Sequence, residues 1–119
     1  MLREPTFLIL AAVAPASLHG YGIIRAVERL SDGRARLRAG TLYAALDRLV
    51  GEGALAVERE EVVDGRLRRY YAITDAGLDL LRSGVDRMEA NAAAARDQLA
   101  LRAGGPAAGG AHAGGGSRA

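Results

Sequence analysis

Apolar residues between positions 39 and 52 recur with the spacing of a helix that buries one side. These apolar positions are Leu42, Ala45, Leu46 and Leu49, which fall on one stripe of a helix with 3.6 residues per turn. The expected outer face is polar or small and consists of Thr41, Tyr43, Ala44, Asp47 and Arg48. Gly53 follows the last periodic residues, so we expect the helix to end near Glu52.

A β-hairpin is predicted around Asp64-Gly65, a dipeptide that tolerates the positive φ angles of a type I′ turn. The turn sets the register, and the expected cross-strand pairs are Val63 with Arg66, Val62 with Leu67, Glu61 with Arg68, Glu60 with Arg69, and Arg59 with Tyr70. Two of these pairs join opposite charges. We therefore expect Arg68 and Arg69 to be partly neutralised, and Arg66 to remain available for a phosphate.

The first helix is expected to open at Pro5 in its first turn. Its apolar residues, Phe7, Leu8, Ile9, Leu10 and Val13, point in every direction around the helix. A helix that is apolar all round must be covered on all sides, so we expect a partner subunit to cover part of it.

A turn is expected at residues 19–22, followed by a second amphipathic helix that ends at Asp32-Gly33. We interpret Tyr21 as a core aromatic residue with its hydroxyl at the rim, and His19 as a turn residue.

The last helix carries a coiled-coil repeat. Apolar residues alternate spacings of three and four, at Leu78, Leu81, Val85, Met88, Ala92, Ala95 and Leu99. Thr74 is the expected N-cap, and the helix is expected to run to about Arg102. Such a seam predicts a second helix against it, and hence a homodimer. The expected interface consists of Phe7, Leu10, Leu78, Leu81, Val85, Met88, Ala92 and Leu99.

These elements divide the chain into three parts: a domain at residues 1–73, a dimerisation helix at 74–102, and a Gly/Ala-rich tail at 103–119 that is expected to be disordered. The fold class they predict is α+β, mainly α: a winged helix-turn-helix with a C-terminal dimerisation helix. In such folds the exposed helix enters a DNA groove while the hairpin contacts the adjacent backbone.

Composition changes this picture little. The chain has 119 residues and a formal net charge of +2, and it contains no cysteine, which excludes disulfides and thiolate metal sites. The charge is concentrated, because Arg34, Arg36, Arg38 and Arg48 stand against Asp47 alone between positions 34 and 48. We expect no cofactor, no metal and no catalytic constellation, and therefore not an enzyme.

The apolar run from Thr6 to Ala14 has a second interpretation as a signal peptide. We reject it, because Glu4 and Pro5 stand where a basic leader is expected and the run is too short to span a membrane. A cytoplasmic protein is the expectation.

Three segments resemble one family, the PadR-like transcriptional regulators in their short form with a single C-terminal helix. The segment from Arg38 to Leu49 resembles their recognition-helix signature, the segment from Asp64 to Gly77 resembles their wing, and Gly20-Tyr21-Gly22-Ile23-Ile24 resembles the start of their second helix. The resemblance implies a homodimeric DNA-binding regulator, usually a repressor, often released by a small aromatic or hydrophobic effector.

The expected DNA contacts combine the outer helix face, the basic residues and the resemblance: Arg38, Thr41, Tyr43, Ala44, Arg48, Arg66 and Arg68. The expected effector site lies at the dimer centre and is lined by Phe7, Leu10, Val85 and Met88. The alternative from another class is a winged-helix protein-interaction module without DNA binding, in which the wing charges are merely solvated.

Overall fold

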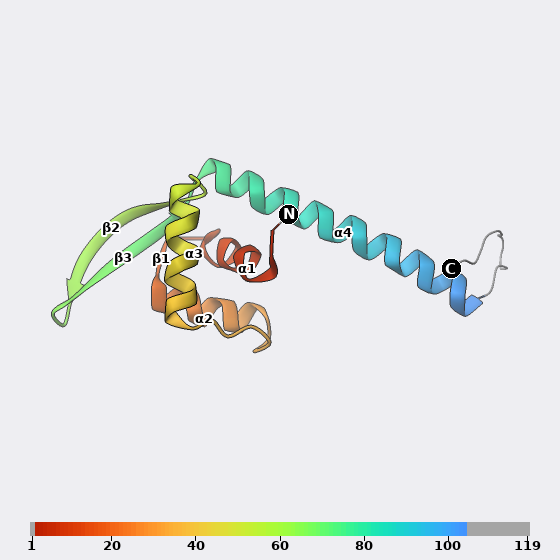
Figure 1. Ribbon diagram of the computed structural model, residues 1–119, viewed down its shortest axis with the longest axis horizontal. Helices are drawn as coiled ribbons and strands as arrows, with labels where there is room; N and C mark the ends of the chain where they lie inside the picture. Colours follow the sequence, from red (N-terminus) through yellow and green to blue (C-terminus); the bar gives the residue numbers. More distant parts are fainter. Residues whose placement is uncertain (1, 105–119) are drawn as a thin grey trace. The chain divides into compact units, whose positions relative to one another are not determined.

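The computed structural model describes residues 2–104 and forms a winged helix-turn-helix followed by a long helix, which confirms the expected α+β fold class (Figure 1). Its elements are α1 (Glu4–Val13), β1 (Leu18–His19), α2 (Gly20–Leu30), α3 (Ala39–Gly51), β2 (Leu55–Val63), β3 (Arg66–Ile73) and α4 (Asp75–Gly104). The three strands form one antiparallel sheet in the order β1-β3-β2.

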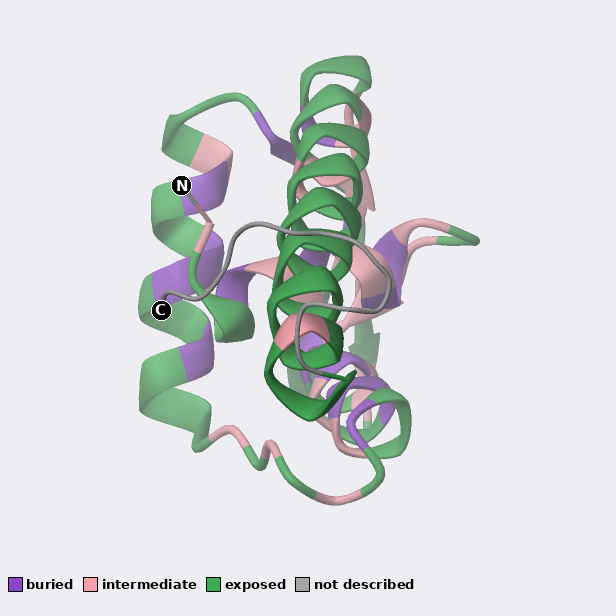
Figure 2. Ribbon diagram, turned by 90° about the vertical axis from the view of Figure 1, so that its right-hand side faces the viewer, coloured by how far each residue is buried: buried purple, intermediate pink, exposed green. Residues whose placement is uncertain are grey.

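One core holds α1, α2, α3 and the base of the hairpin together. Its largest fully buried side chains are Ile9, Leu10, Val13, Ile23, Val27, Leu42, Leu46, Leu49 and Leu55. The stripe predicted for α3 is thus buried. In Figure 2 the purple, buried positions lie on one side of α3 and the green, exposed positions lie on the other. The opposite side of α3 is left open for function.

Helix α1 begins with Pro5 in its first turn, as predicted, but its own chain covers more of it than expected. Leu10 has no exposed surface. The partly buried Phe7 lies against α4, because a Cβ atom added at Gly84 would come within 3.1 Å of the Phe7 ring. The prediction that Leu10 contacts a partner or an effector is therefore wrong: Leu10 is a core residue.

Helix α3 ends as the sequence predicts. Gly53 adopts a φ of 81°, and its N–H donates to the carbonyl of Val50 at 3.0 Å. The next N–H, that of Ala54, reaches the carbonyl of Leu49 at 2.9 Å. This pair of hydrogen bonds is a Schellman motif, which satisfies the last carbonyls of the helix and turns the chain into β2.

The hairpin has the predicted turn and the predicted register. Asp64 and Gly65 both have positive φ angles, 52° and 77°. The pairs run from Val63 with Arg66 to Arg59 with Tyr70, as expected from the turn. Beyond that point the register shifts at a β-bulge between Val57 and Arg59. The bulge increases the local twist of the wing.

Strand β1 was not predicted. Leu18 and His19 pair with Tyr71 and Tyr70 of β3, and α2 begins directly afterwards at Gly20. The turn expected at residues 19–22 is therefore wrong, because these residues close the sheet and open a helix. This arrangement places the start of α2 beside the wing.

Helix α4 is capped by Thr74, as predicted: the Gly77 N–H donates to the Thr74 hydroxyl at 3.0 Å. The same hydroxyl donates to the carbonyl of Gly53, and the Thr74 N–H donates to that of Ala54. The first compact unit of the chain extends to Gly84, beyond the expected boundary at residue 73. Most of the expected tail, from residue 105 on, lies outside the described residues.

Candidate nucleic-acid interface

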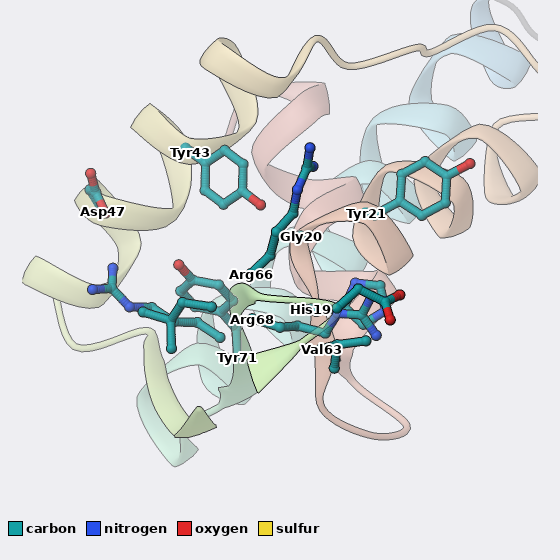
Figure 3. Close-up of a pocket in the computed structure, with 12 residues that line it drawn as sticks. His19, Gly20, Tyr21, Tyr43, Asp47, Val63, Arg66, Arg68 and Tyr71 are labelled. Atoms are coloured by element: carbon teal, nitrogen blue, oxygen red, sulfur yellow. The ribbon is translucent and has the colours of Figure 1, made fainter. Parts of the chain in front are cut away.

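A groove of about 800 Å³ separates the start of α2 and the outer side of α3 from the wing (Figure 3). It is lined by His19, Gly20, Tyr21, Tyr43, Asp47, Val63, Asp64, Arg66, Leu67, Arg68, Arg69 and Tyr71. Three of these residues are arginines on β3. The groove therefore combines an exposed helix face with basic side chains on a hairpin, the two parts that a winged helix presents to DNA.

Tyr43 stands on the groove side of α3, with 46% of its surface exposed. A Cβ atom added at Gly20 would overlap the Tyr43 hydroxyl, so the first residue of α2 must be a glycine for this pose. The Tyr43 hydroxyl therefore lies beside the start of α2 while nearly half of the residue's surface is exposed, which suits contact with a base or a phosphate.

The wing arginines differ in how far their charges are satisfied. Arg69 is paired as predicted, because its Nε donates a hydrogen bond to Glu60 at 2.7 Å. This hydrogen bond is the main reason that the pKa of Arg69 is raised. Arg66 forms no ion pair with any residue between 2 and 104. The predicted order, with Arg66 more available than Arg69, agrees with this geometry.

The predicted pairing of Arg68 with Glu61 is wrong at the level of side chains. The Glu61 carboxylate accepts a hydrogen bond from the Tyr70 hydroxyl at 2.7 Å and one from Arg59 at 2.9 Å. The Tyr70 bond is the main reason that the pKa of Glu61 is lowered, and Arg59 adds to it. Arg59 also stacks over the Tyr70 ring, 3.7 Å from its centroid. Arg68 is left without an ion pair among the described residues.

The other flank of α3 faces α1. Thr41, Ala44 and Arg48 line a second hollow of about 730 Å³. Here Arg48 is engaged: its Nη2 donates to the Thr6 hydroxyl at 2.9 Å, and its Nε lies 3.9 Å from Glu52. Arg48 is thus half-exposed, but its guanidinium is held toward α1 by the bond to Thr6. The sequence did not predict this restraint.

His19 caps α2 with its imidazole. The Gly22 N–H donates to Nδ1 at 3.2 Å, and the ring lies edge-on to Tyr70 at 5.4 Å. Burial and the charge of Arg68 lower the pKa of His19, against the opposing effect of Glu61. The neutral imidazole is the form that can accept the bond. The position of His19 before a helix was the only indication of this role in the sequence.

Tyr21 is not the core residue that we expected, since 63% of its surface is exposed. It stands at the start of α2 and lines the groove, with Arg25 stacked 5.7 Å from its ring centre. Arg38 immediately precedes α3 and is exposed, as a DNA contact requires. Tyr21 is therefore added to the candidate residues.

The expected seam of α4 divides into two groups. Leu81 packs partly against the chain's own core, and Leu78 is half-buried. The remaining members are exposed: Val85, Met88, Ala92 and Leu99. Val85 and Met88 expose 39% and 50% of their surface, and Leu99 exposes 65%. The second half of α4 therefore presents these apolar side chains at the surface of the chain, and it is drawn mostly green in Figure 2.

Other kinds of site find no support within residues 2–104. No three His, Asp or Glu side chains there come close enough together to hold a metal ion. In the same stretch, no helix has the combination of length and apolar character that a membrane crossing requires.

Comparison with protein families gives a match to the model described as "Transcriptional regulator PadR-like family", over residues 9–83. The matched region includes α2, α3, the wing and the first turns of α4. A curated relative, "Transcriptional regulator Rv3488" of Mycobacterium tuberculosis, is 42% identical over 69 residues, which are 58% of this chain and 61% of that protein. The aligned part therefore spans less than two thirds of that relative.

Solved structures share the fold. A PadR family transcription regulator from Clostridium difficile R20291 superposes with a TM-score of 0.69 at 21% identity, covering 82% of this chain and 99% of the other. Bacillus subtilis PadR in complex with operator DNA superposes with a TM-score of 0.63 at 21% identity, covering 70% of this chain and 48% of the other.

Proposed function

This chain belongs to the PadR-like family of transcriptional regulators, and from that premise we propose that it binds duplex DNA as a homodimer and represses transcription. In this proposal α3 enters the major groove and the wing contacts the neighbouring phosphates. The contacts come from Arg38, Thr41, Tyr43, Ala44, Arg48, Arg66 and Arg68, together with Tyr21.

One observation carries the proposal: the exposed side of α3 lines the same groove as two wing arginines that form no ion pair within residues 2–104. Tyr43 lies on one wall, and Arg66 and Arg68 lie on the other (Figure 3). An arginine that has no carboxylate partner keeps its full charge for phosphate oxygens. The chain also superposes on a PadR that was solved in complex with operator DNA, which supports DNA binding by this fold.

The dimer is proposed from the second half of α4. From Val85 to Gly104 almost every residue is exposed, including the apolar ones spaced by three and four. An isolated helix with this pattern gains little from its own chain, whereas a second copy would bury the stripe. Two-fold symmetry then requires an approximately palindromic operator.

Release by a hydrophobic effector is not included in the proposal. Of the residues expected to line such a site, Leu10 is fully buried in the core and Phe7 is partly buried beside Gly84. Of the α1 residues in the expected site, Leu10 is therefore closed off by the chain's own core.

The test is the salt dependence of binding to duplex DNA from the region upstream of its own gene. If each protomer neutralises three or four phosphates, log K against log salt should have a slope of about −5 to −7. Arg66→Ala should flatten the slope by about 2, one contact per protomer. The matched control is Arg82→Ala, an exposed arginine of α4 that pairs with Asp79. A wild-type slope near zero would refute the proposed function.

A further inference from the structure

The outermost line of α3 carries a single charged residue, and that residue is negative. Asp47 lies opposite the buried stripe, and its neighbours along this line are Gly40, Ala44 and Gly51. A Cβ atom added at Gly40 or Gly51 would meet nothing within 4 Å. A surface that approaches α3 from outside therefore meets small residues and one carboxylate.

No residue between 2 and 104 neutralises this carboxylate. Asp47 takes part in no ion pair or side-chain hydrogen bond within that range. Arg48, the next residue along the helix, is directed instead to Thr6 and Glu52. Asp47 stands one turn beyond Tyr43 on the wall of the groove (Figure 3).

An unpaired carboxylate on a DNA-binding face has a cost and one compensation. Phosphates repel it whatever the sequence, so it weakens binding to most DNA. It gains a hydrogen bond only where a base presents a donor. In the major groove guanine presents two acceptors and thymine one, adenine presents a donor beside an acceptor, and cytosine presents the N4 amino donor. Cytosine is the base that suits this side chain.

We propose that Asp47 accepts a hydrogen bond from the N4 amino group of a cytosine in each half of the operator. The inference rests on the proposed function and adds to it a specificity-determining residue and the base that this residue selects. Asp47 lowers the affinity for DNA in general, and the hydrogen bond to cytosine restores this affinity where a cytosine lies opposite Asp47 in the half-site. The small neighbours Gly40 and Ala44 allow the base edge to approach the helix.

The experiment is selection from randomised duplexes, with sequencing, by the full chain and by three variants. Asp47→Ala removes the acceptor, and Asp47→Asn replaces it with an isosteric amide. Asp86→Asn is the control, because it makes the same change of charge at an exposed position of α4 outside the apolar seam. Thermal unfolding of each variant is followed in parallel, and surface changes of this kind should leave the melting temperature unchanged within a few degrees.

Wild-type sites should show cytosine at one position per half-site, preferred by about 5- to 150-fold, the range of one good base contact. Asp47→Ala and Asp47→Asn should both lose this preference at that position while keeping the others, and Asp47→Ala should bind random DNA more tightly. Asp86→Asn should select the wild-type sites. If both Asp47 variants select the same bases as the wild type, the inference is wrong and the proposed function stands. If the wild type retains no duplex, both fail.

Discussion

Replacing Gly77 by alanine should destabilise the joint between the DNA-binding unit and α4. Gly77 is buried at the third position of α4, and a Cβ atom there would overlap the carbonyl oxygen of Ala54. That carbonyl already accepts the N–H of Thr74, so it belongs to a fixed backbone turn that cannot rotate away. The helix must shift instead.

The magnitude follows from two opposing effects. Overpacking costs about 1–3 kcal/mol, and an overlap with a fixed backbone carbonyl lies in the upper part of that range, at about 2–3 kcal/mol. The gain in helix propensity from glycine to alanine offsets up to about 1 kcal/mol of it. The free energy of unfolding should therefore fall by about 1–2 kcal/mol, which corresponds to a melting temperature lower by about 4–16 °C in a domain of this size.

Calorimetry or circular dichroism measures this change. The control is Gly40→Ala, the same substitution in a helix at a position where the new methyl group meets nothing within 4 Å. That variant should be unchanged or more stable, by up to about 1 kcal/mol. A Gly77→Ala protein as stable as the wild type would show that α4 does not pack on the Ala54 turn as described.

Two further predictions concern the cap of α2 and the helix seam. Because the pKa of His19 is lowered in the fold, the contribution of this residue to stability should be complete above the ordinary pKa of 6.5 and decline as the pH falls below it. His19→Asn keeps a cap acceptor and should flatten this decline in urea midpoints measured from about pH 5 to 8. An unchanged pH profile would exclude His19 as the cause of the decline. Val85→Asp should yield monomers by light scattering, because an unpaired carboxylate in the seam is costly. Ala90→Asp, on the opposite side of α4, should leave the dimer intact, and a Val85→Asp protein that remains dimeric would refute the seam.

The sequence was most informative where a short segment determines its own geometry. The dipeptide Asp64-Gly65 admits few turns, and the turn alone sets the register of the five pairs from Val63 with Arg66 to Arg59 with Tyr70, up to the β-bulge. The end of α3 was equally local, because Gly53 is required by a positive φ angle. The buried stripe of α3 followed from its period.

Individual side-chain contacts could not be predicted in this way. Register places Glu61 opposite Arg68, but the carboxylate has Tyr70 and Arg59 within reach and bonds to them instead. The periodicity of α3 places Arg48 on the exposed face, but its guanidinium donates a hydrogen bond to Thr6, which is far away in the sequence. The first outcome depends on side-chain conformations within the hairpin and the second on tertiary packing, and the hydrophobic periodicity determines neither.

The apolar surface of α1 was misjudged for a related reason. A helix that is apolar all round can be covered by helices of its own chain as well as by a partner, and the sequence does not distinguish the two. Leu10 is covered by its own core, and Phe7 lies against Gly84 of α4. Strand β1 was missed because two residues are too few to show a period.

The most direct test of the central claim is the effect of half-site spacing on binding by the full chain. A homodimer that places two α3 helices in successive major grooves needs half-site centres about 34–36 Å apart. The account predicts that a selected palindrome loses at least about 10-fold in affinity when half a helical turn, about 5 base pairs, is inserted at its centre. Equal affinity for the two duplexes would contradict a symmetric DNA-binding dimer.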